Sequence, residues 1–330
     1  MGDHQIYVIG VSGEELPIGH IDEHITECST IIAAASVLGR IQELYETDYP
    51  LKQWVLITPV SRCLDIISET INSDSVMVLT SGDPLFYGLG NTLKNRFPDK
   101  QLVFLPALSS LQLCFARFGE VWNDTAFLSL HGRSFADLNS ELHRNKLFIL
   151  TDRDNSPDKI ARHLLEILSP SEQERYLMHV GVRLGTKKEQ LYSGSLLDIS
   201  DRSFKQPNCT ILLRRQNPSV AANIFGLQES EIRHSRGLIT KNEVRAAVLH
   251  ALRLPPKGVF WDIGAGSGSI SLEAGLLNPG LAVYAIEQKQ DQIDNITHNR
   301  TAFKCWNMTI CEGKAPQALE SLPRPDSIFI

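Results

Sequence analysis

The sequence predicts an α/β protein made of two domains in series. Short apolar runs alternate with segments of helical periodicity over the first 215 residues, the pattern of an α/β fold. A second series contains the glycine turn Gly264–Gly268 between an apolar run and a helical segment. Asn217-Pro218 and a polar stretch through Arg236 separate the two series. We therefore place a first domain at 1–215, a linker at 216–236 and a second domain at 237–330.

The first half of the first domain begins with a strand almost at the N-terminus. Valine, isoleucine and leucine dominate its four strand-like runs, and helical periodicity fills the intervals between them. Strands are predicted at 6–11, 54–57, 76–80 and 102–106, and helices at 18–38, at 63–71 and in a segment ending near 96.

The second half of this domain repeats the alternation, with a predicted helix start at Ala107–Ser110. Strands are predicted at 127–130, 147–150, 176–180 and 209–213, and helices at 135–144 and 157–168. Alternation of this kind predicts the fold class but leaves the order of the strands open.

Two glycine-containing loops follow strands of the first domain. Gly10–Gly13 closes the first strand, and Ser81–Gly90 follows the strand at 76–80. Loops at the carboxyl ends of parallel strands are where α/β folds bind ligands. We therefore expect a ligand cleft there, although a simple type I turn around Asp83-Pro84 is the alternative.

The second domain reads as strand, glycine turn and helix. Glycines without a Cβ let the backbone approach a ligand, and the following helix offers free N–H groups. A second strand at 282–287 ends in Glu287, a carboxylate suited to two ribose hydroxyls. The G-x-G-x-G spacing favours S-adenosylmethionine as cofactor. The dinucleotide pattern is G-x-G-x-x-G, and an NAD(P)-dependent oxidoreductase is the alternative.

A helix is predicted ahead of this turn. It starts at Thr240 with a Thr240–Glu243 capping box, and its core face is predicted from helical spacing. That face comprises Val244, Ala247, Val248, Ala251 and Leu252. The chain stops in another strand-like run at 326–330, so we expect the second domain to be incomplete at its C-terminus.

Composition excludes several function classes. Hydrophobic residues make up 42% and charged residues 21%, with a net charge of −6, so no general basic field favours nucleic acid or an anionic membrane. The six cysteines lack metal-ligand spacing, so we expect no metal and a reducing, cytoplasmic location. No signal segment is seen, and no apolar run reaches the roughly 18 residues of a membrane helix. We expect a soluble, unprocessed chain.

The motifs of the first domain resemble those of the tetrapyrrole methylase family. They are Val8–Gly13, Ser81–Gly88 and Pro106–Gln112, and Ser129–Arg133 resembles the branch that acts on precorrins late in corrin-ring assembly. The first turn departs from the family pattern in having fewer glycines. The family implies a tetrapyrrole methylase fold of two α/β subdomains, and a homo-oligomer.

The second domain is similar to the decarboxylating precorrin methyltransferases, which have a Rossmann-like fold. Gly237–Arg245 precedes Trp261–Gly268 as in that family. Both domains in this order resemble the fused methyltransferases that act on precorrin-6Y. The resemblance implies two S-adenosylmethionine-dependent methylations, at carbons 5 and 15, with decarboxylation of the ring C acetate, in cobalamin biosynthesis. Another tetrapyrrole methyltransferase is the alternative.

Cofactor contacts are expected in both domains. In the first, Gly82 and its neighbours shape the donor cleft and two serines line its other wall. In the second, the glycines approach the methionine part, Asp262 orders the turn, and the segment after the strand at 308–311 meets adenine, although Glu312 reads equally as a solvated acid. The expected cofactor residues are Gly10, Gly82, Asp83, Pro84, Ser109, Ser110, Thr240, Asp262, Gly264, Gly266, Gly268, Glu287, Glu312, Gly313 and Ala315.

Substrate contacts are expected from basic side chains, because the macrocycle carries many carboxylates while the chain is net acidic. Arg133 suits a two-pronged contact with a propionate or acetate, and we expect a basic cleft around it. The expected substrate residues are His131, Arg133, Lys241 and Arg245. A helix cap or a solvated face explains Thr240, Lys241 and Arg245 equally well, and a lone histidine is more often structural. No nucleophile or catalytic base is identifiable.

Overall fold

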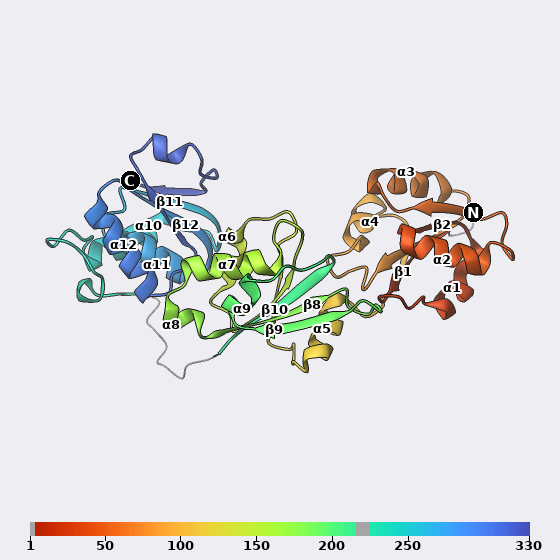
Figure 1. Ribbon diagram of the computed structural model, residues 1–330. Helices are drawn as coiled ribbons and strands as arrows, with labels where there is room; N and C mark the ends of the chain where they lie inside the picture. The colour runs from red at the N-terminus through yellow and green to blue at the C-terminus, as the bar shows by residue number, and fades with distance from the viewer. Residues whose placement is uncertain (1–3, 216–224) are drawn as a thin grey trace. The chain divides into compact units, whose positions relative to one another are not determined.

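The computed structural model describes residues 4–215 and 225–330. These residues form two compact units (Figure 1). The first comprises the chain up to Trp122 with Val180–Tyr192 and Lys205–Cys209, and the second comprises Asn123–His179, Ser193–Phe204 and Thr210–Ile330. The expected linker lies partly at 216–224, outside the described residues.

A five-stranded parallel sheet forms the centre of the first unit. Its order is β3-β2-β4-β1-β5, with β1 at Gln5–Val11, β2 at Cys28–Ala33, β3 at Gln53–Leu56, β4 at Ser75–Ser81 and β5 at Gln101–Leu105. β1 and β4 are buried on both faces and read as near-continuous apolar runs, which explains why both could be predicted from the sequence.

Helices cover both faces of this sheet. α1 (Ile18–His24) and α2 (Ala35–Tyr45) pack on Tyr7 and Ile9, whereas α3 (Val60–Thr70) and α4 (Gly90–Arg96) pack on Ile6 and Val8 (Figure 1). The connections that leave the neighbouring strands β1 and β4 therefore run over opposite faces. A crevice forms outside the carboxyl ends of two such strands.

The prediction of one continuous helix at 18–38 is wrong. The structure has two helices there, separated by a 3₁₀ turn and by strand β2. The buried β2 segment includes Thr30, Ile31 and Ile32, whose branched side chains favour strands. A short apolar run of this kind cannot be distinguished from a buried helix by periodicity.

The second sheet has the order β6-β7-β10-β8-β9. Its strands are β6 (Ala126–Ser129), β7 (Lys146–Leu150), β8 (Tyr176–Val182), β9 (Gln190–Gly194) and β10 (Asn208–Arg214). The helices of this region are α5 (Ser110–Phe118), α6 (Phe135–Glu141), α7 (Pro157–Ile167), α8 (Pro170–Gln173) and α9 (Leu196–Ser200). Four strands and the helices α6 and α7 confirm the expectation, while β9 and α9 went unrecognised in the sequence.

A third, four-stranded parallel sheet lies in the second unit. Its order is β13-β12-β11-β14, with β11 at Lys257–Ile263, β12 at Gly280–Glu287, β13 at Met308–Glu312 and β14 at Ser327–Phe329. α10 (Asn242–Leu252), α11 (Ser269–Leu277) and α12 (Gln290–Ala302) contribute to the core that covers Phe260, Val283 and Met308 (Figure 1).

Two expectations about α10 are wrong. The helix begins one residue after Lys241, which caps it without a side-chain hydrogen bond, so no Thr240–Glu243 capping box forms. Its buried positions are Arg245 and Leu249, while Val244 is 52% exposed. Val248 and Leu252 do pack on the core, so the true core face is rotated from the predicted one.

Part of the expected linker belongs to the core of the second domain. Leu227 and Ile232 are buried in the same apolar cluster as Phe260. The packed region therefore starts well before residue 237.

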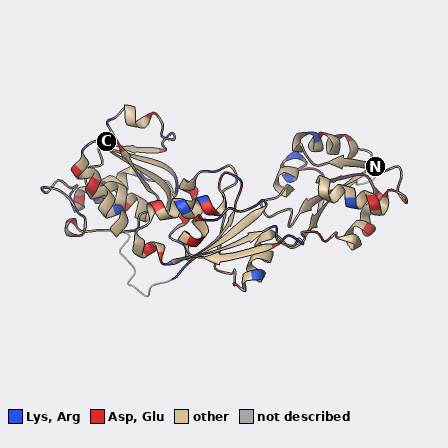
Figure 2. Cartoon of the chain, in the orientation of Figure 1, with Lys and Arg blue, Asp and Glu red and all other residues tan. Residues whose placement is uncertain are grey.

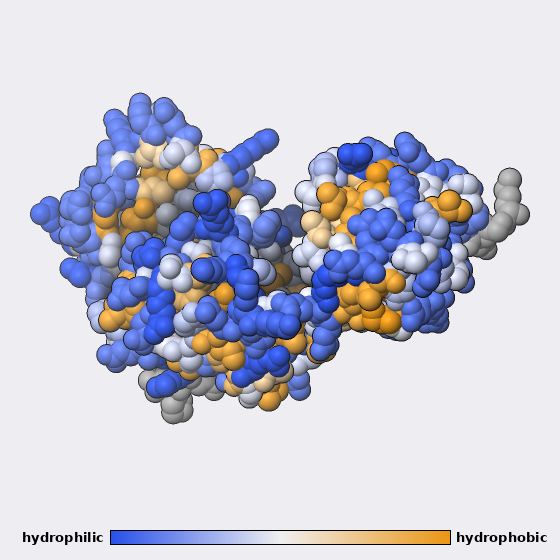
Figure 3. Space-filling view, turned by 45° about the vertical axis from the view of Figure 1, so that its right-hand side comes forward, coloured by the Kyte–Doolittle hydropathy of each residue, from blue (hydrophilic) through white to orange (hydrophobic). Residues whose placement is uncertain are grey.

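Charges and apolar groups are distributed without a dominant field. Figure 2 shows acidic and basic residues interspersed over the helices of both units. The apolar groups that reach the face seen in Figure 3 do so in separate patches among hydrophilic residues. None of the helices in the described ranges is long and apolar enough to cross a membrane.

Candidate functional site

The glycine turn Gly264–Gly268 connects β11 to α11 at the carboxyl edge of the third sheet. Gly264, Gly266 and Gly268 have φ values of +78°, +57° and +74°, in the left-handed region that favours glycine. A Cβ on Gly264 or Gly266 would have no atom within 4 Å. The space over both glycines is open, and α11 begins at Gly268 without a side-chain cap. This cradle fits a ligand that needs close backbone approach.

Asp262, at the end of β11, stabilises this turn through Ser271. Its carboxylate Oδ2 accepts hydrogen bonds from the Ser271 backbone N–H at 3.1 Å and from the Ser271 hydroxyl at 2.6 Å. Burial raises the pKa of Asp262 to about 6, against the two Ser271 bonds and with a further contribution from Glu287. Asp262 is 1% exposed, and its two bonds join the end of β11 to the first turn of α11, on either side of the glycine turn.

Glu287 lies beside the turn at the end of β12. Its Oε2 accepts from the Gly266 N–H at 2.9 Å, and its Oε1 accepts from the N–H groups of Gln288 and Lys289 at 2.8 and 3.0 Å. Oε2 accepts only one of these bonds and keeps a second lone pair, so a hydroxyl donor can still bind there. The structure thus places the carboxylate of Glu287 next to the cradle.

The segment after β13 reaches the same edge. Glu312 is paired in register with Glu287, and the Gly313 N–H donates to the Glu287 carbonyl oxygen at 2.9 Å. Gly313 has φ +139°, which allows the chain to turn there. Ala315 follows two residues later, so the predicted adenine segment lies beside the predicted ribose carboxylate.

The three residues predicted ahead of the turn have unequal environments. Thr240 is half-buried, and its carbonyl oxygen accepts a bond from Arg245 Nη1 at 2.9 Å. Lys241 is exposed and pairs with Glu229 at 2.6 Å. Its ammonium group stays accessible to solvent.

The structure contradicts the predicted substrate contact of Arg245. Its side chain is 1% exposed and pairs with Glu273 at 2.9 Å. The guanidinium also donates to the carbonyl oxygens of Thr240 and Leu227 and to the Asn242 side chain. These contacts occupy the guanidinium inside the core, so Arg245 is a structural ion-pair partner and the expected substrate contact is wrong.

In the first unit, three loops converge at the carboxyl ends of β4, β1 and β5. The Gly82 N–H donates to the Val11 carbonyl oxygen at 2.8 Å, and the Ala107 N–H donates to the Gly82 carbonyl oxygen at 3.4 Å. A Cβ on Gly10 would overlap both the Gly82 carbonyl oxygen and the Ala107 nitrogen. Gly10 is therefore required for the loops to approach, and it lies at the crevice between β1 and β4.

The neighbouring predicted residues mostly shape these loops. Asp83 Oδ1 accepts from the Leu85 N–H at 2.8 Å, and the buried Pro84 accepts from the Gly90 N–H at 2.9 Å. Ser109 caps α5 through a capping box with Gln112, which confirms the predicted helix start. Its hydroxyl is bonded to Gln112 within this box, so the structure does not support a contact between that hydroxyl and the methyl donor. Ser110 opens α5 and is half-buried.

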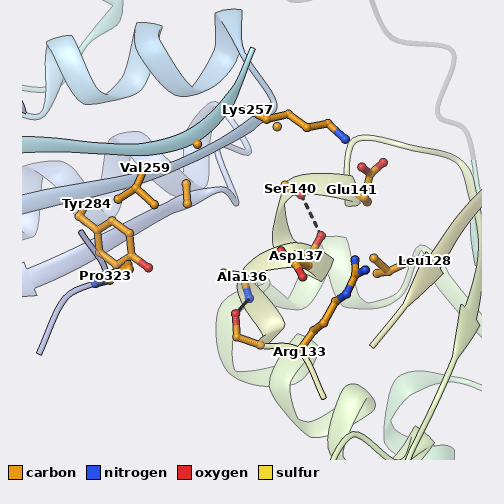
Figure 4. A pocket seen from close by; sticks show the side chains of 14 residues that line it. Leu128, Arg133, Ala136, Asp137, Ser140, Glu141, Lys257, Val259, Tyr284 and Pro323 are labelled. Carbon is orange, nitrogen blue, oxygen red and sulfur yellow. Dashed lines mark hydrogen bonds between the residues drawn. The ribbon is translucent and has the colours of Figure 1, made fainter. Parts of the chain in front are cut away.

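Arg133 and His131 lie on the loop between β6 and α6. The His131 side chain is 80% exposed, and its Nδ1 is 3.9 Å from Asp152. Arg133 lines a cavity of about 390 Å³ within the second unit, and His131 does not. α6 forms one side of this cavity and the sheet residues Val259 and Tyr284 form the other (Figure 4).

This cavity differs from the expected basic cleft. Arg133 and Lys257 share it with the acids Asp137 and Glu141, so its lining has mixed charge. Lys257 is the first residue of β11, so the cavity lies at the amino end of that strand, whereas the glycine turn lies at the carboxyl end. The structure does not bring Arg133 to the cradle.

Two asparagines that the sequence did not reveal bond the segment before α10, and one of them, Asn299, also bonds the glycine turn. Asn299 Nδ2 donates to the carbonyl oxygens of Ser267 and Arg233 at 3.0 and 2.8 Å, and its Oδ1 accepts from the Arg233 N–H at 2.8 Å. Asn295 Nδ2 donates to the Ser235 hydroxyl at 2.8 Å. Partners 60 and 66 positions away leave no local signal in the sequence.

Over 4–215 and 225–330, no group of three or more His, Cys, Asp or Glu side chains could hold a metal ion.

Family models match both halves of the chain. A model described as tetrapyrrole (corrin/porphyrin) methylases matches residues 59–200, and one described as a precorrin methyltransferase domain matches residues 231–330. Both concern methyltransferases, which favours a methyl donor over the NAD(P) alternative at the glycine turn.

Curated relatives span both domains. A protein from Sinorhizobium sp. named precorrin-6Y C(5,15)-methyltransferase [decarboxylating] is 34% identical over 83% of this chain and 66% of its own length. The protein of the same name from Mycobacterium tuberculosis H37Rv is 27% identical over 98% of this chain and 80% of its own. The chain thus spans about two thirds of the first relative and four fifths of the second.

A solved structure matches part of the chain. The precorrin-6Y C5,15-methyltransferase structure from Geobacter metallireducens is 42% identical over 31% of this chain and 55% of its own, with a TM-score of 0.31. On the two family models and the Sinorhizobium relative, the chain belongs to the tetrapyrrole methylases and carries a precorrin methyltransferase domain behind the first domain.

Proposed function

We propose that this chain methylates a precorrin macrocycle at carbons 5 and 15, with decarboxylation of the ring C acetate, in cobalamin biosynthesis. The names of the relatives support this activity. The structural observation that carries it is the open glycine cradle of the second domain, with Asp262 and Glu287 bonded beneath and beside it. The proposed cofactor is S-adenosylmethionine in both domains.

The cradle suits this cofactor by its chemistry. Gly264 and Gly266 leave space for a ligand against the backbone, and the uncapped start of α11 offers N–H groups to a carboxylate. Glu287 would accept hydrogen bonds from ribose hydroxyls. In the first domain, the crevice bordered by Gly10 and Gly82 is the proposed second donor site.

Positioning is the main work asked of these residues. S-adenosylmethionine, when bound, supplies an electrophilic methyl group on a sulfonium. The electron-rich ring carbon is the nucleophile, so the protein needs to hold the two in line. Such alignment contributes roughly 7–11 kcal/mol in favourable cases. A cytoplasmic location and a homo-oligomeric state belong to the same proposal.

The test is methyl transfer to precorrin-6Y with isotopically labelled S-adenosylmethionine. We expect mass spectrometry to show that the product has gained two labelled methyl groups and has lost the mass of one carbon dioxide. The Gly266→Asp variant should still add the methyl group of the first domain but release no carbon dioxide. Transfer of no methyl group by the unaltered chain would overturn the proposal.

A further inference from the structure

A short basic turn, Arg233–Leu238, is attached to the glycine cradle of the second domain. Asn299 bonds both backbone polar groups of Arg233 and, through the same amide, the Ser267 carbonyl oxygen in the glycine turn. Asn299 is 1% exposed. Because an amide bonded on three sides has little freedom to move, the start of the basic turn keeps a fixed position relative to the cradle.

The rest of the basic turn is fixed as well. Asn295 on α12 bonds the Ser235 hydroxyl, and the Leu238 N–H donates to the Ser235 carbonyl oxygen at 2.9 Å. α10 follows and ends just before β11, which starts at the amino edge of the sheet. α10 therefore starts near the carboxyl edge, where the cradle lies, and the basic turn lies at that edge too.

The side chains of the basic turn are available for a ligand. Arg233 and Arg236 are exposed, and neither has an acceptor for its guanidinium among the described residues. Two nearby cations are occupied, since Lys241 pairs with Glu229 and Arg245 pairs with Glu273. Leu238, at the end of the turn, is 59% exposed and adds an apolar surface.

The backbone of the turn is strained at Arg236. Arg236 has φ +52°, in the left-handed region, and Gly237 follows with φ +71°. A non-glycine residue in that region is uncommon, and strain of this kind is often found where a side chain is held for binding. The strained residue here is a free arginine beside a ligand cradle.

We propose that the basic turn binds the carboxylate side chains of the macrocycle and holds the ring against the cradle. This inference rests on the proposed function and adds the residues that select an acidic ring. The forked guanidinium groups of Arg233 and Arg236 take acetate or propionate groups in two-pronged contacts, and Leu238 contacts the ring edge. Asn299 is the positioning residue that sets the distance from the bound carboxylates to the methyl donor.

The experiment measures methyl transfer to precorrin-6Y and, separately, binding of uroporphyrin by fluorescence, since uroporphyrin carries acetate and propionate on every pyrrole. The variants are Arg236→Asn, which tolerates the left-handed backbone, Arg233→Gln, and Arg236→Lys, which keeps the charge. The matched control is Arg253→Asn, because Arg253 is also an exposed arginine with positive φ, at the opposite end of α10.

We expect Arg236→Asn and Arg233→Gln each to raise the KM for precorrin-6Y and the Kd for uroporphyrin roughly tenfold, the size of one lost charge-assisted contact. Affinity for S-adenosylmethionine should stay unchanged, Arg236→Lys should recover part of the loss, and Arg253→Asn should resemble the unaltered chain. If Arg236→Asn behaves like Arg253→Asn while methyl transfer proceeds, the basic turn has no such role and the proposed function stands. If the unaltered chain transfers no methyl group, both proposals fail together.

Discussion

The carboxylate of Glu287 accepts a hydrogen bond from the backbone N–H of Gly266 at 2.9 Å. The side chain suited to a ribose therefore also holds the glycine turn in shape. We expect Glu287→Gln to lower the affinity of the second domain for S-adenosylmethionine at least tenfold, because an amide nitrogen would face backbone N–H groups. Calorimetry measures this affinity, and the exposed Glu243→Gln variant of α10 is the control. Unchanged affinity in Glu287→Gln would remove Glu287 from the donor site.

Gly10 allows three loops of the first unit to meet. Gly10→Ala should destabilise that unit by more than about 2 kcal/mol, because its Cβ would overlap backbone atoms of Gly82 and Ala107. Gly39→Ala is the matched substitution, since Gly39 lies inside α2 with nothing within 4 Å of a Cβ. It should stabilise the unit by about 0.5–1 kcal/mol. Urea unfolding measures both values, and equal effects would contradict the close approach described at Gly10.

Asp262 gives the second domain a specific pH dependence. Its pKa in the folded protein, about 6, lies above the ordinary value of 3.8, so the folded state holds this proton more tightly than the unfolded state. Its contribution to stability is present below pH 4 and is lost as the pH rises through 6. The unfolding free energy of the unaltered chain should therefore fall relative to that of Asp262→Asn between about pH 4 and pH 6. Above pH 6 the difference between the two should stay constant. A difference that does not change with pH would show that burial does not raise the pKa of Asp262.

The Arg245–Glu273 pair should act on stability and leave substrate affinity alone. Arg245→Met leaves Glu273 as an unpaired charge that is 2% exposed, and it should cost about 3–5 kcal/mol. The double variant Arg245→Met with Glu273→Gln should recover part of that loss, measured by denaturant unfolding. Among folded variants, a selective rise in the KM for precorrin-6Y would return Arg245 to the substrate site.

Local patterns were sufficient to predict the elements that hold the glycine turn. The strand before Asp262, the helix after Gly268 and the acid at Glu287 are all encoded within a few positions, so periodicity and turn chemistry indicate them. The helix start at Ser109 was likewise visible, because its capping box with Gln112 is local.

Long-range contacts decided what the sequence could not reveal. Arg245 looked like a surface cation because its partner Glu273 is 28 positions away. The first four residues of the basic turn, 233–236, were assigned to the linker, since their attachment depends on Asn299, 66 positions from Arg233. Strand β2 was missed for another reason, because its apolar run fits a helix as well as a strand.

The most direct measurement is calorimetric titration of S-adenosylmethionine into the unaltered chain and into Gly266→Asp, with circular dichroism to confirm that the variant is folded. Aspartate tolerates the left-handed backbone at this position, while its side chain enters the space expected for the donor. We predict two binding sites per chain, falling to one in Gly266→Asp. A single site that the substitution leaves unchanged, or binding of NADH in place of S-adenosylmethionine, would contradict the claim that the chain carries two methyl-donor domains.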